Sequence, residues 1–165
     1  MASWGELGRA RPDLSEGGTS LLYQHGVGLA FLATVRPSGG PRLHPVCPLL
    51  ADDAMYGFII PSPKQQDLLR DGRYALHSFP TPNNEDAFYL TGQAHAIEGG
   101  DLRDRLGRQF VEERAQFHVP TPAGTDILFV FDIDSCLLTR TSGFGDQDPQ
   151  HLVWRDQDAA PSAEA

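Results

Sequence analysis

Cysteine is scarce in this sequence, and long apolar runs are absent. The two cysteines, Cys47 and Cys136, stand far apart and fit no zinc-ligand spacing, so we expect free thiols in a reducing cytoplasm. No stretch approaches the roughly 18 apolar residues of a membrane span. The opening residues, "MASWGELGRARPDL", lack the apolar core of a signal peptide. We therefore predict a cytoplasmic protein.

Positive charge is also in short supply. Of the 165 residues, 13 are Lys or Arg and 22 are Asp or Glu, so the formal net charge is -9. A surface this acidic repels phosphate backbones and anionic lipids, and we expect neither nucleic acid nor membranes as partners. The length suits one domain, predicted over 1–155 with a helical segment at 1–26. The small polar residues at 156–165 predict a disordered tail.

Motifs typical of catalysis are missing. The sequence contains no G-x-S-x-G elbow, no phosphate-binding P-loop, no G-x-G-x-x-G fingerprint and no H-E-x-x-H. We therefore predict no catalytic side chain. The six histidines are dispersed, but His44, His77 and His95 fall on predicted strands. A barrel could gather them around a metal, or each could be a half-buried strand residue with one hydrogen bond.

The apolar pattern is mostly of the strand type. Pro45 and Pro48 would leave a central strand short of donors, so the strand at 42–50 should lie at an edge or carry a bulge. Short helices are predicted at 63–71 and from 101 to about 117. Because the helices do not alternate with the strands, the pattern predicts a mainly β (α+β) antiparallel fold with peripheral helices. The other strands are expected at 28–36, 54–60, 74–79, 87–97, 126–133, 136–140 and 151–155.

The helix at 63–71 has an unusual start. Ser62 is a good N-cap, Pro63 suits the first helical position, and Gln65 would complete a capping box. Lys64 is mildly unfavourable there, because a helix N-terminus carries partial positive charge. An anion from outside the protein would make this lysine useful, and a cofactor could then supply the chemistry. Alternatively, Ser62 is a plain cap and Lys64 a solvated side chain.

Four stretches in order resemble the pyridoxamine 5'-phosphate oxidase-like family of FMN-binding split β-barrels. They are "ATVRPSGGPRLHPV", the strand that ends in "SPK", "LLRDGRYAL" and "FYLTGQA", all within residues 28–98. The later "LFVFDIDSCLLTR" and "HLVWR" are similar to the closing strands of actinobacterial-type members. The resemblance implies a six-stranded antiparallel split β-barrel. It also implies a homodimer with FMN, or a deazaflavin (8-hydroxy-5-deazaflavin coenzyme), at each subunit interface.

The resemblance also implies which residues hold the cofactor. Ser62 and Lys64 would bind the phosphate, while Trp154, together with Arg155, would line the pocket unless Trp154 belongs to the core. The whole set would lie along the ring or hold the phosphate, and it consists of His44, Pro45, Val46, Phe58, Ile59, Ser62, Lys64 and Trp154.

The sequence departs from true pyridoxamine phosphate oxidases. His44 and Leu49 stand where those enzymes have an arginine and a lysine, and Pro63 replaces a basic residue of their phosphate turn. Their arginine- and histidine-containing C-terminal signature is absent too. We therefore predict an FMN-dependent oxidoreductase with a small-molecule substrate, but not a true pyridoxamine phosphate oxidase. The alternatives are a deazaflavin-dependent reductase on the same fold, a non-catalytic flavin- or haem-binding protein, and the metal-binding barrel.

Overall fold

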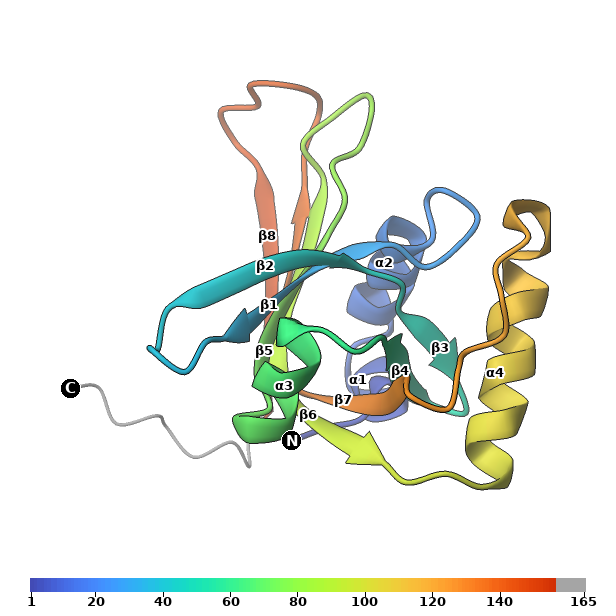
Figure 1. The fold of residues 1–165 in the computed structure, drawn as a ribbon. Helices are drawn as coiled ribbons and strands as arrows, with labels where there is room; N and C mark the ends of the chain where they lie inside the picture. The colour runs from blue at the N-terminus through green and yellow to red at the C-terminus, as the bar shows by residue number, and fades with distance from the viewer. Residues whose placement is uncertain (157–165) are drawn as a thin grey trace.

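The computed structural model describes residues 1–156, whose strands form one antiparallel sheet flanked by helices (Figure 1). Of the predicted tail only Asp156 is described, and the rest lies outside these residues. The helices are α1 (Trp4–Ala10), α2 (Pro12–Leu22), α3 (Pro63–Arg70) and α4 (Asp101–Glu113). The strands are β1 (Ala30–Val35), β2 (Pro41–Val46), β3 (Leu49–Ala51), β4 (Ala54–Ile59), β5 (Arg73–Ser78), β6 (Ala87–Ile97), β7 (Ile127–Arg140) and β8 (Gln150–Arg155).

The sheet is an open barrel split between β2 and β3. These strands end the order β2-β1-β5-β6-β7-β4-β3, while β8 pairs with β7. Only Cys47 and Pro48 separate β2 from β3 in the chain. The predicted mainly β class, with an antiparallel split barrel and peripheral helices, is confirmed. The sheet has eight strands rather than the six implied by the resemblance. The proline-containing strand β2 lies at an edge, as predicted.

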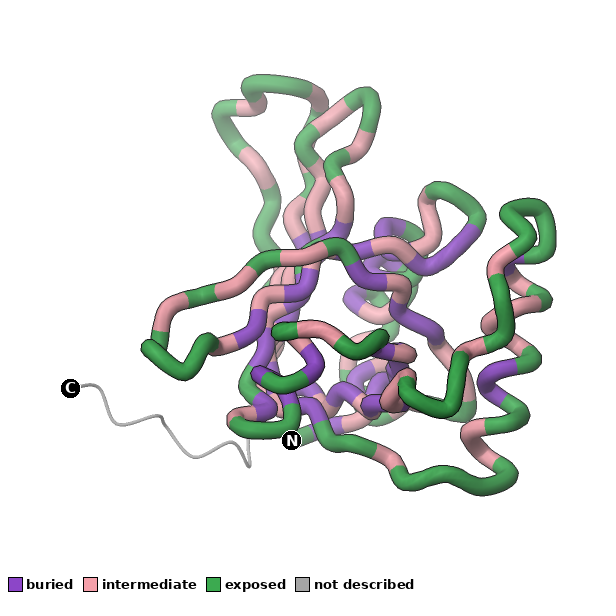
Figure 2. Tube along the Cα trace, viewed as in Figure 1, coloured by how far each residue is buried: buried purple, intermediate pink, exposed green. Residues whose placement is uncertain are grey.

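The main core lies between the inner face of the sheet and helices α1 and α2 (Figure 2). Trp4 of α1 meets Phe88 of β6 edge to face, with ring centroids 5.8 Å apart. The helix α2 contains Gly17 and Gly18, which are weak helix formers. A Cβ at Gly18 would lie 2.7 Å from the Phe88 ring. The glycines therefore let α2 approach the sheet closely.

Helix α4 covers the opposite side of β3 and β4. It forms a second, smaller core in which Phe110 packs edge to face on Phe58 at a centroid distance of 5.7 Å. The N-cap is Gly100, without a side-chain hydrogen bond. The helix stops at Glu113, and a 3-10 turn, Ala115–Phe117, completes the span predicted as helix.

Two aspartates shape the turn between β3 and β4. Asp52 and Asp53 both have positive φ, 46° and 61°, which aspartate tolerates better than most residues. Arg9 of α1 donates to the Asp53 carboxylate at 3.1 Å, and Arg105 of α4 pairs with Asp52. The turn is thus tied to helices on both sides. Within residues 1–156, no helix is both long and apolar enough to cross a membrane.

Candidate functional site

The first turn of α3 is anchored to the end of β4. The Oγ of Ser62 accepts from the Gln65 backbone N–H at 3.4 Å and donates to the Ile60 carbonyl at 2.8 Å. The predicted N-cap is therefore confirmed, but the capping box is not. The Gln65 side-chain amide instead donates to the carbonyls of Ile59 and Thr125, at 2.7 and 3.2 Å. This buried amide fixes the position of the turn.

Lys64, the only lysine in the sequence, lies in this turn. Within residues 1–156 its one hydrogen bond runs from Nζ to the Pro45 carbonyl of β2, at 3.3 Å, and it pairs with no carboxylate. Burial lowers the pKa of the ammonium group, and the charge of the nearby Cys47 opposes that shift. The positive end of the helix adds to this unbalanced charge. An anion from outside the chain would balance it.

The next turn of α3 holds a buried carboxylate. Asp67 is 2% exposed and accepts from Arg42 Nε at 2.7 Å, Thr34 Oγ1 at 3.0 Å and Arg70 Nη1 at 3.1 Å. Burial alone would raise the pKa of Asp67, but these donors lower it below its ordinary value. Arg70 also donates to the Val35 carbonyl. Asp67 thus ties α3 to β1 and β2.

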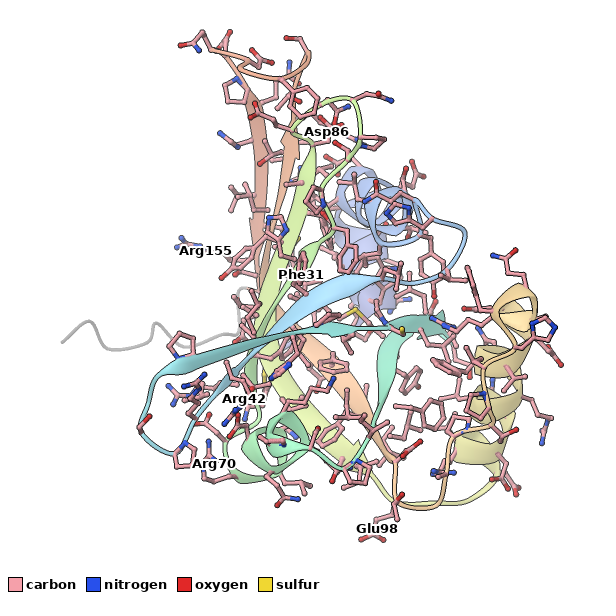
Figure 3. The ribbon with its side chains drawn as sticks, turned by 45° about the horizontal axis from the view of Figure 1, so that its top comes forward. Phe31, Arg42, Arg70, Asp86, Glu98 and Arg155 are labelled. Carbon is pink, nitrogen blue, oxygen red and sulfur yellow. The ribbon has the colours of Figure 1, made fainter. Side chains whose placement is uncertain are left out.

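These side chains leave an excess of positive charge on one side of α3. Arg42 and Arg70 share the one carboxylate of Asp67, and Lys64 pairs with no carboxylate within residues 1–156, although the whole chain carries a net charge of -9. Figure 3 shows Arg42 and Arg70 on the same side of the molecule, beside α3. A phosphate monoester carries two negative charges at neutral pH and accepts such hydrogen bonds. The residues present therefore fit a phosphate-bearing cofactor.

Sequence analysis missed the roles of Arg42, Asp67 and Arg70. One signal was available, because Lys64 and Asp67 stand three residues apart and so share one face of the helix. Arg42, which binds Asp67 on that face, lies on a strand 25 positions earlier in the sequence. No local pattern predicts this pairing.

The register of the strands builds a largely apolar row on the face of the sheet opposite α1 and α2. Directly paired residues of adjacent strands point to the same face. This outer row consists, strand by strand from β2 to β8, of Pro45, Phe31, His77, Tyr89, Leu137 and Val153. None of its residues is buried. Its Pro45 end lies beside Lys64, so an apolar surface runs up to the unbalanced charge.

Two stacked aromatic residues enlarge the apolar surface of the row near β1. Phe31 stacks on Phe79, with ring centroids 4.4 Å apart and an interplanar angle of 24°. On the same face, Leu43 of β2 is 63% exposed and Val153 of β8 is 52% exposed. Continuous apolar surface of this kind is typical of a ligand or partner site.

The cofactor residues implied by the resemblance do not all gather in one place. Pro45, Ser62 and Lys64 lie together at the start of α3. The side chains of Val46 and Ile59 are buried in the main core, at 6% and 1% exposed.

The remaining predicted residues lie elsewhere. Phe58 packs against α4, with the Arg103 guanidinium 5.5 Å from its ring centroid. Trp154 packs against the main core, while Arg155 lies on the outer face opposite Ser135. Figure 3 shows Arg155 projecting away from β8.

The three strand histidines are not brought together. His44 pairs with Leu32 on the inner face, whereas His77 pairs with Phe31 on the outer face. His95 lies on β6 with its Nε2 3.5 Å from the Asp132 carboxylate. No group of three metal-ligating side chains exists within residues 1–156. The alternation of side chains along a strand separates His44 from His77.

Comparisons of the sequence with family models and with curated proteins give no match. Solved structures do match the fold. A pyridoxamine 5'-phosphate oxidase-related, FMN binding protein from Nostoc punctiforme superposes with a TM-score of 0.60 at 15% identity. The match covers 92% of this chain and 91% of that one. This chain has the fold of pyridoxamine 5'-phosphate oxidase-like proteins.

Two further solved structures share this pyridoxamine 5'-phosphate oxidase-like fold. One is a general stress protein 26-related protein of the pyridoxinephosphate oxidase family from Clostridium acetobutylicum. It has a TM-score of 0.62 and 12% identity, over 87% of this chain and 96% of that one. The other is a heme binding protein from Mycobacterium smegmatis, with a TM-score of 0.65 and 17% identity over 88% of this chain. The present chain spans 59% of that protein. The resemblance seen in the sequence is confirmed at the level of the fold.

Proposed function

We propose that this protein is an FMN-dependent oxidoreductase. The observation that carries the proposal is the Lys64 ammonium, which lies at the N-terminus of α3 without a carboxylate partner among residues 1–156 and beside Pro45 of the outer row. The phosphate of FMN would balance this charge, and the apolar row would support the ring. When bound, the flavin supplies hydride transfer. The tasks left to the chain are to bind, orient and shield.

Further donors are available for the phosphate. Pro63 has no N–H and the Gln65 N–H already donates to the Ser62 Oγ, so the Lys64 N–H is the backbone donor of the first turn that is left for an anion. Arg42 uses only its Nε on Asp67, and within residues 1–156 its two Nη groups have no hydrogen bond. They can donate in parallel to a phosphate, as guanidinium groups do. Val46 and Ile59 would shape the site from the core rather than touch the cofactor.

We propose that the protein works as a homodimer. The outer face carries the exposed Leu43 and Val153, and the side chain of Arg155 has no hydrogen bond or ion pair within residues 1–156. A hollow of about 300 Å³, lined in part by Ala33 and Ala75, adjoins Leu43 on this face. A second copy would cover the apolar surface and enclose a planar cofactor from its open side. Hydrophobic burial would drive the association.

The proposal is tested by identifying the molecule that native protein releases on denaturation, by mass spectrometry. We expect FMN, together with a yellow protein and turnover of a reduced nicotinamide or a similar donor. A colourless protein that binds deazaflavin would support the deazaflavin-dependent reductase instead. Flavin binding without turnover would leave a non-catalytic binder. Oxidation of pyridoxamine phosphate should be negligible, because the substrate-binding signature is absent from the sequence.

Haem binding is a second candidate function on the same surface. The neighbour from Mycobacterium smegmatis is a heme binding protein. The face of a porphyrin is apolar and aromatic, and Phe31 and Phe79 of the outer face form a stacked aromatic pair on which it could pack. A haem protein also needs a side chain that ligates the iron.

A further inference from the structure

One histidine of the outer row has a fixed tautomer. The Nδ1 of His77 lies 2.6 Å from the backbone carbonyl oxygen of Ser78. A carbonyl oxygen can only accept, so Nδ1 carries the proton and donates it. In the neutral ring Nε2 therefore keeps its lone pair. The His77 residue is exposed, and its ring makes no other hydrogen bond within residues 1–156.

The surroundings of His77 are apolar and aromatic. In the strand register it stands between Phe31 of β1 and Tyr89 of β6. The stacked ring of Phe79 extends this surface beyond Phe31. A planar aromatic ligand would pack well against these side chains. The lone pair of Nε2 is thus the one strong electron donor in the middle of an apolar row.

A single imidazole is too few protein ligands for a bare metal ion but enough for a metal porphyrin. A bare ion such as Zn²⁺ needs three or four protein ligands, and residues 1–156 hold no group of three. An iron porphyrin already brings four nitrogen ligands and needs only an axial one from the protein. Its two anionic propionates leave the same edge of the porphyrin, and the Lys64 end of the row offers them a cation.

We propose that Nε2 of His77 is the axial ligand of an iron porphyrin bound on the outer row. The inference deepens the second candidate function and does not require the flavin site to be loaded. The Nδ1–H bond to Ser78 is the type of contact that fixes the tautomer and the orientation of metal-ligating histidines. Ligation forms one N–Fe bond, displaces a water from the iron and transfers no electron.

A matched control exists on the same face of the sheet. His151 of β8 is exposed and also uses its Nδ1, which lies 3.0 Å from the Thr139 hydroxyl. A hydroxyl can donate or accept, so this contact does not fix the tautomer. In the register His151 lies opposite Thr139, two residues from the outer row. His151 therefore lacks both the fixed tautomer and the position within the outer row that distinguish His77.

The test is a haemin titration of the full chain, followed by absorption spectroscopy. The wild type and His151→Ala should bind haemin and give the same imidazole-ligated Soret band. His77→Ala should bind at least tenfold more weakly and lose that band, and added imidazole should restore it. His77→Gln should behave like His77→Ala, and circular dichroism checks that each variant is folded.

Two results would overturn the assignment in distinguishable ways. If His77→Ala and His77→Gln keep the wild-type spectrum, haem binding stands but His77 is not the ligand. If the wild type does not bind haemin, the second candidate function fails and the ligand assignment fails with it. FMN titration of the same proteins without haemin reports on the flavin proposal separately.

Discussion

The ammonium of Lys64 and the carbonyl oxygen of Pro45 are 3.3 Å apart, although the two residues are separated by 19 positions in the sequence. This contact brings the first turn of α3 to the end of the outer row. A carbonyl oxygen is a partial countercharge only, so the lysine remains electrostatically unbalanced. This contact defines where on the surface the proposed anion site would lie.

Replacing Lys64 by methionine should separate ligand binding from folding. Charge-assisted hydrogen bonds contribute roughly 1.5–3 kcal/mol, so FMN affinity should fall about ten- to a hundredfold. The free energy of unfolding of the ligand-free protein should change by less than about 0.5 kcal/mol. The variant loses one hydrogen bond, but it also avoids the cost of partly burying a charge, the effect that lowers the pKa of this ammonium. Riboflavin, which lacks the phosphate, should bind both proteins equally. Equal FMN affinity in the two proteins would show that Lys64 is only a solvated charge.

Ser62→Ala should affect stability as well as affinity. The Oγ of Ser62 caps α3 and also donates to the Ile60 carbonyl. Loss of an N-cap costs about 1 kcal/mol, and thermal melts without ligand should report it. The comparison with Lys64→Met is the control, because that variant keeps the cap. A ligand-free Ser62→Ala protein as stable as the wild type would mean that the cap contributes nothing here.

The buried Asp67 should contribute to the acid sensitivity of the fold. Removing one partner of a buried ion pair costs 3–5 kcal/mol, and Asp67→Asn should cost about 3 kcal/mol because both arginines can still reach water. The folded-state pKa of Asp67 is lowered, so its contribution is complete above the unfolded carboxyl pKa of about 3.9. That contribution disappears as the pH falls through the folded pKa. The stability gap between wild type and Asp67→Asn should therefore narrow below about pH 4.

Asp13→Asn provides the control for this measurement. Arg11 pairs with Asp13 at 2.7 Å, but the Asp13 side chain is 47% exposed. Exposed ion pairs contribute little to stability because solvent screens them, so Asp13→Asn should cost far less than Asp67→Asn. Urea unfolding of the three proteins between neutral and acid pH gives the comparison. Similar losses for both variants, or a gap that does not change with pH, would contradict the role assigned to Asp67.

Gly28→Ala should strongly destabilise the fold. A Cβ at Gly28 would lie 2.0 Å from the carbonyl oxygen of Pro48. The carbonyls of Gly28 and Pro48 both accept from the buried Arg114, at 3.3 and 3.4 Å. The added methyl group would push apart backbone segments that this guanidinium holds together, at about 3 kcal/mol. Gly99→Ala, with nothing within 4 Å of its Cβ, should change stability by less than about 0.5 kcal/mol in denaturant unfolding.

Leu43→Glu should disrupt the proposed dimer without unfolding the subunit. Leu43 is 63% exposed on the outer face, so a charge there is solvated in the monomer and desolvated in an interface. Sedimentation equilibrium at micromolar concentration should give a dimer for the wild type and the 18.0 kDa monomer for the variant. Leu69→Glu, at an exposed position of α3, should remain dimeric. A monomeric wild type would contradict both the dimer and a cofactor site shared between subunits.

The sequence predicted those elements whose signals are local. The helix predicted at 63–71 is α3, Pro63–Arg70, because the cap, the proline and the apolar spacing all lie within one short segment. The proline at 45 placed β2 at an edge for an equally local reason, the loss of a backbone donor. The prediction of one strand over 42–50 was wrong, because the strand breaks at Cys47 and Pro48 into β2 and β3. The two strands predicted at 126–133 and 136–140 form one strand, β7. Its bulge opposite Thr91 and Gly92 is set by the partner strand, which a single segment does not reveal.

What the tertiary structure decided is which residues meet. Alternation along each strand assigns side chains to two faces, but only the pairing between strands aligns His77 with Phe31 and Tyr89. The carboxylate of Asp67 acquires its lowered pKa from donors on three elements. The tautomer of His77 depends on one backbone oxygen at 2.6 Å. Such contacts are set by packing over long sequence separations, whereas local propensity and periodicity act within a few residues.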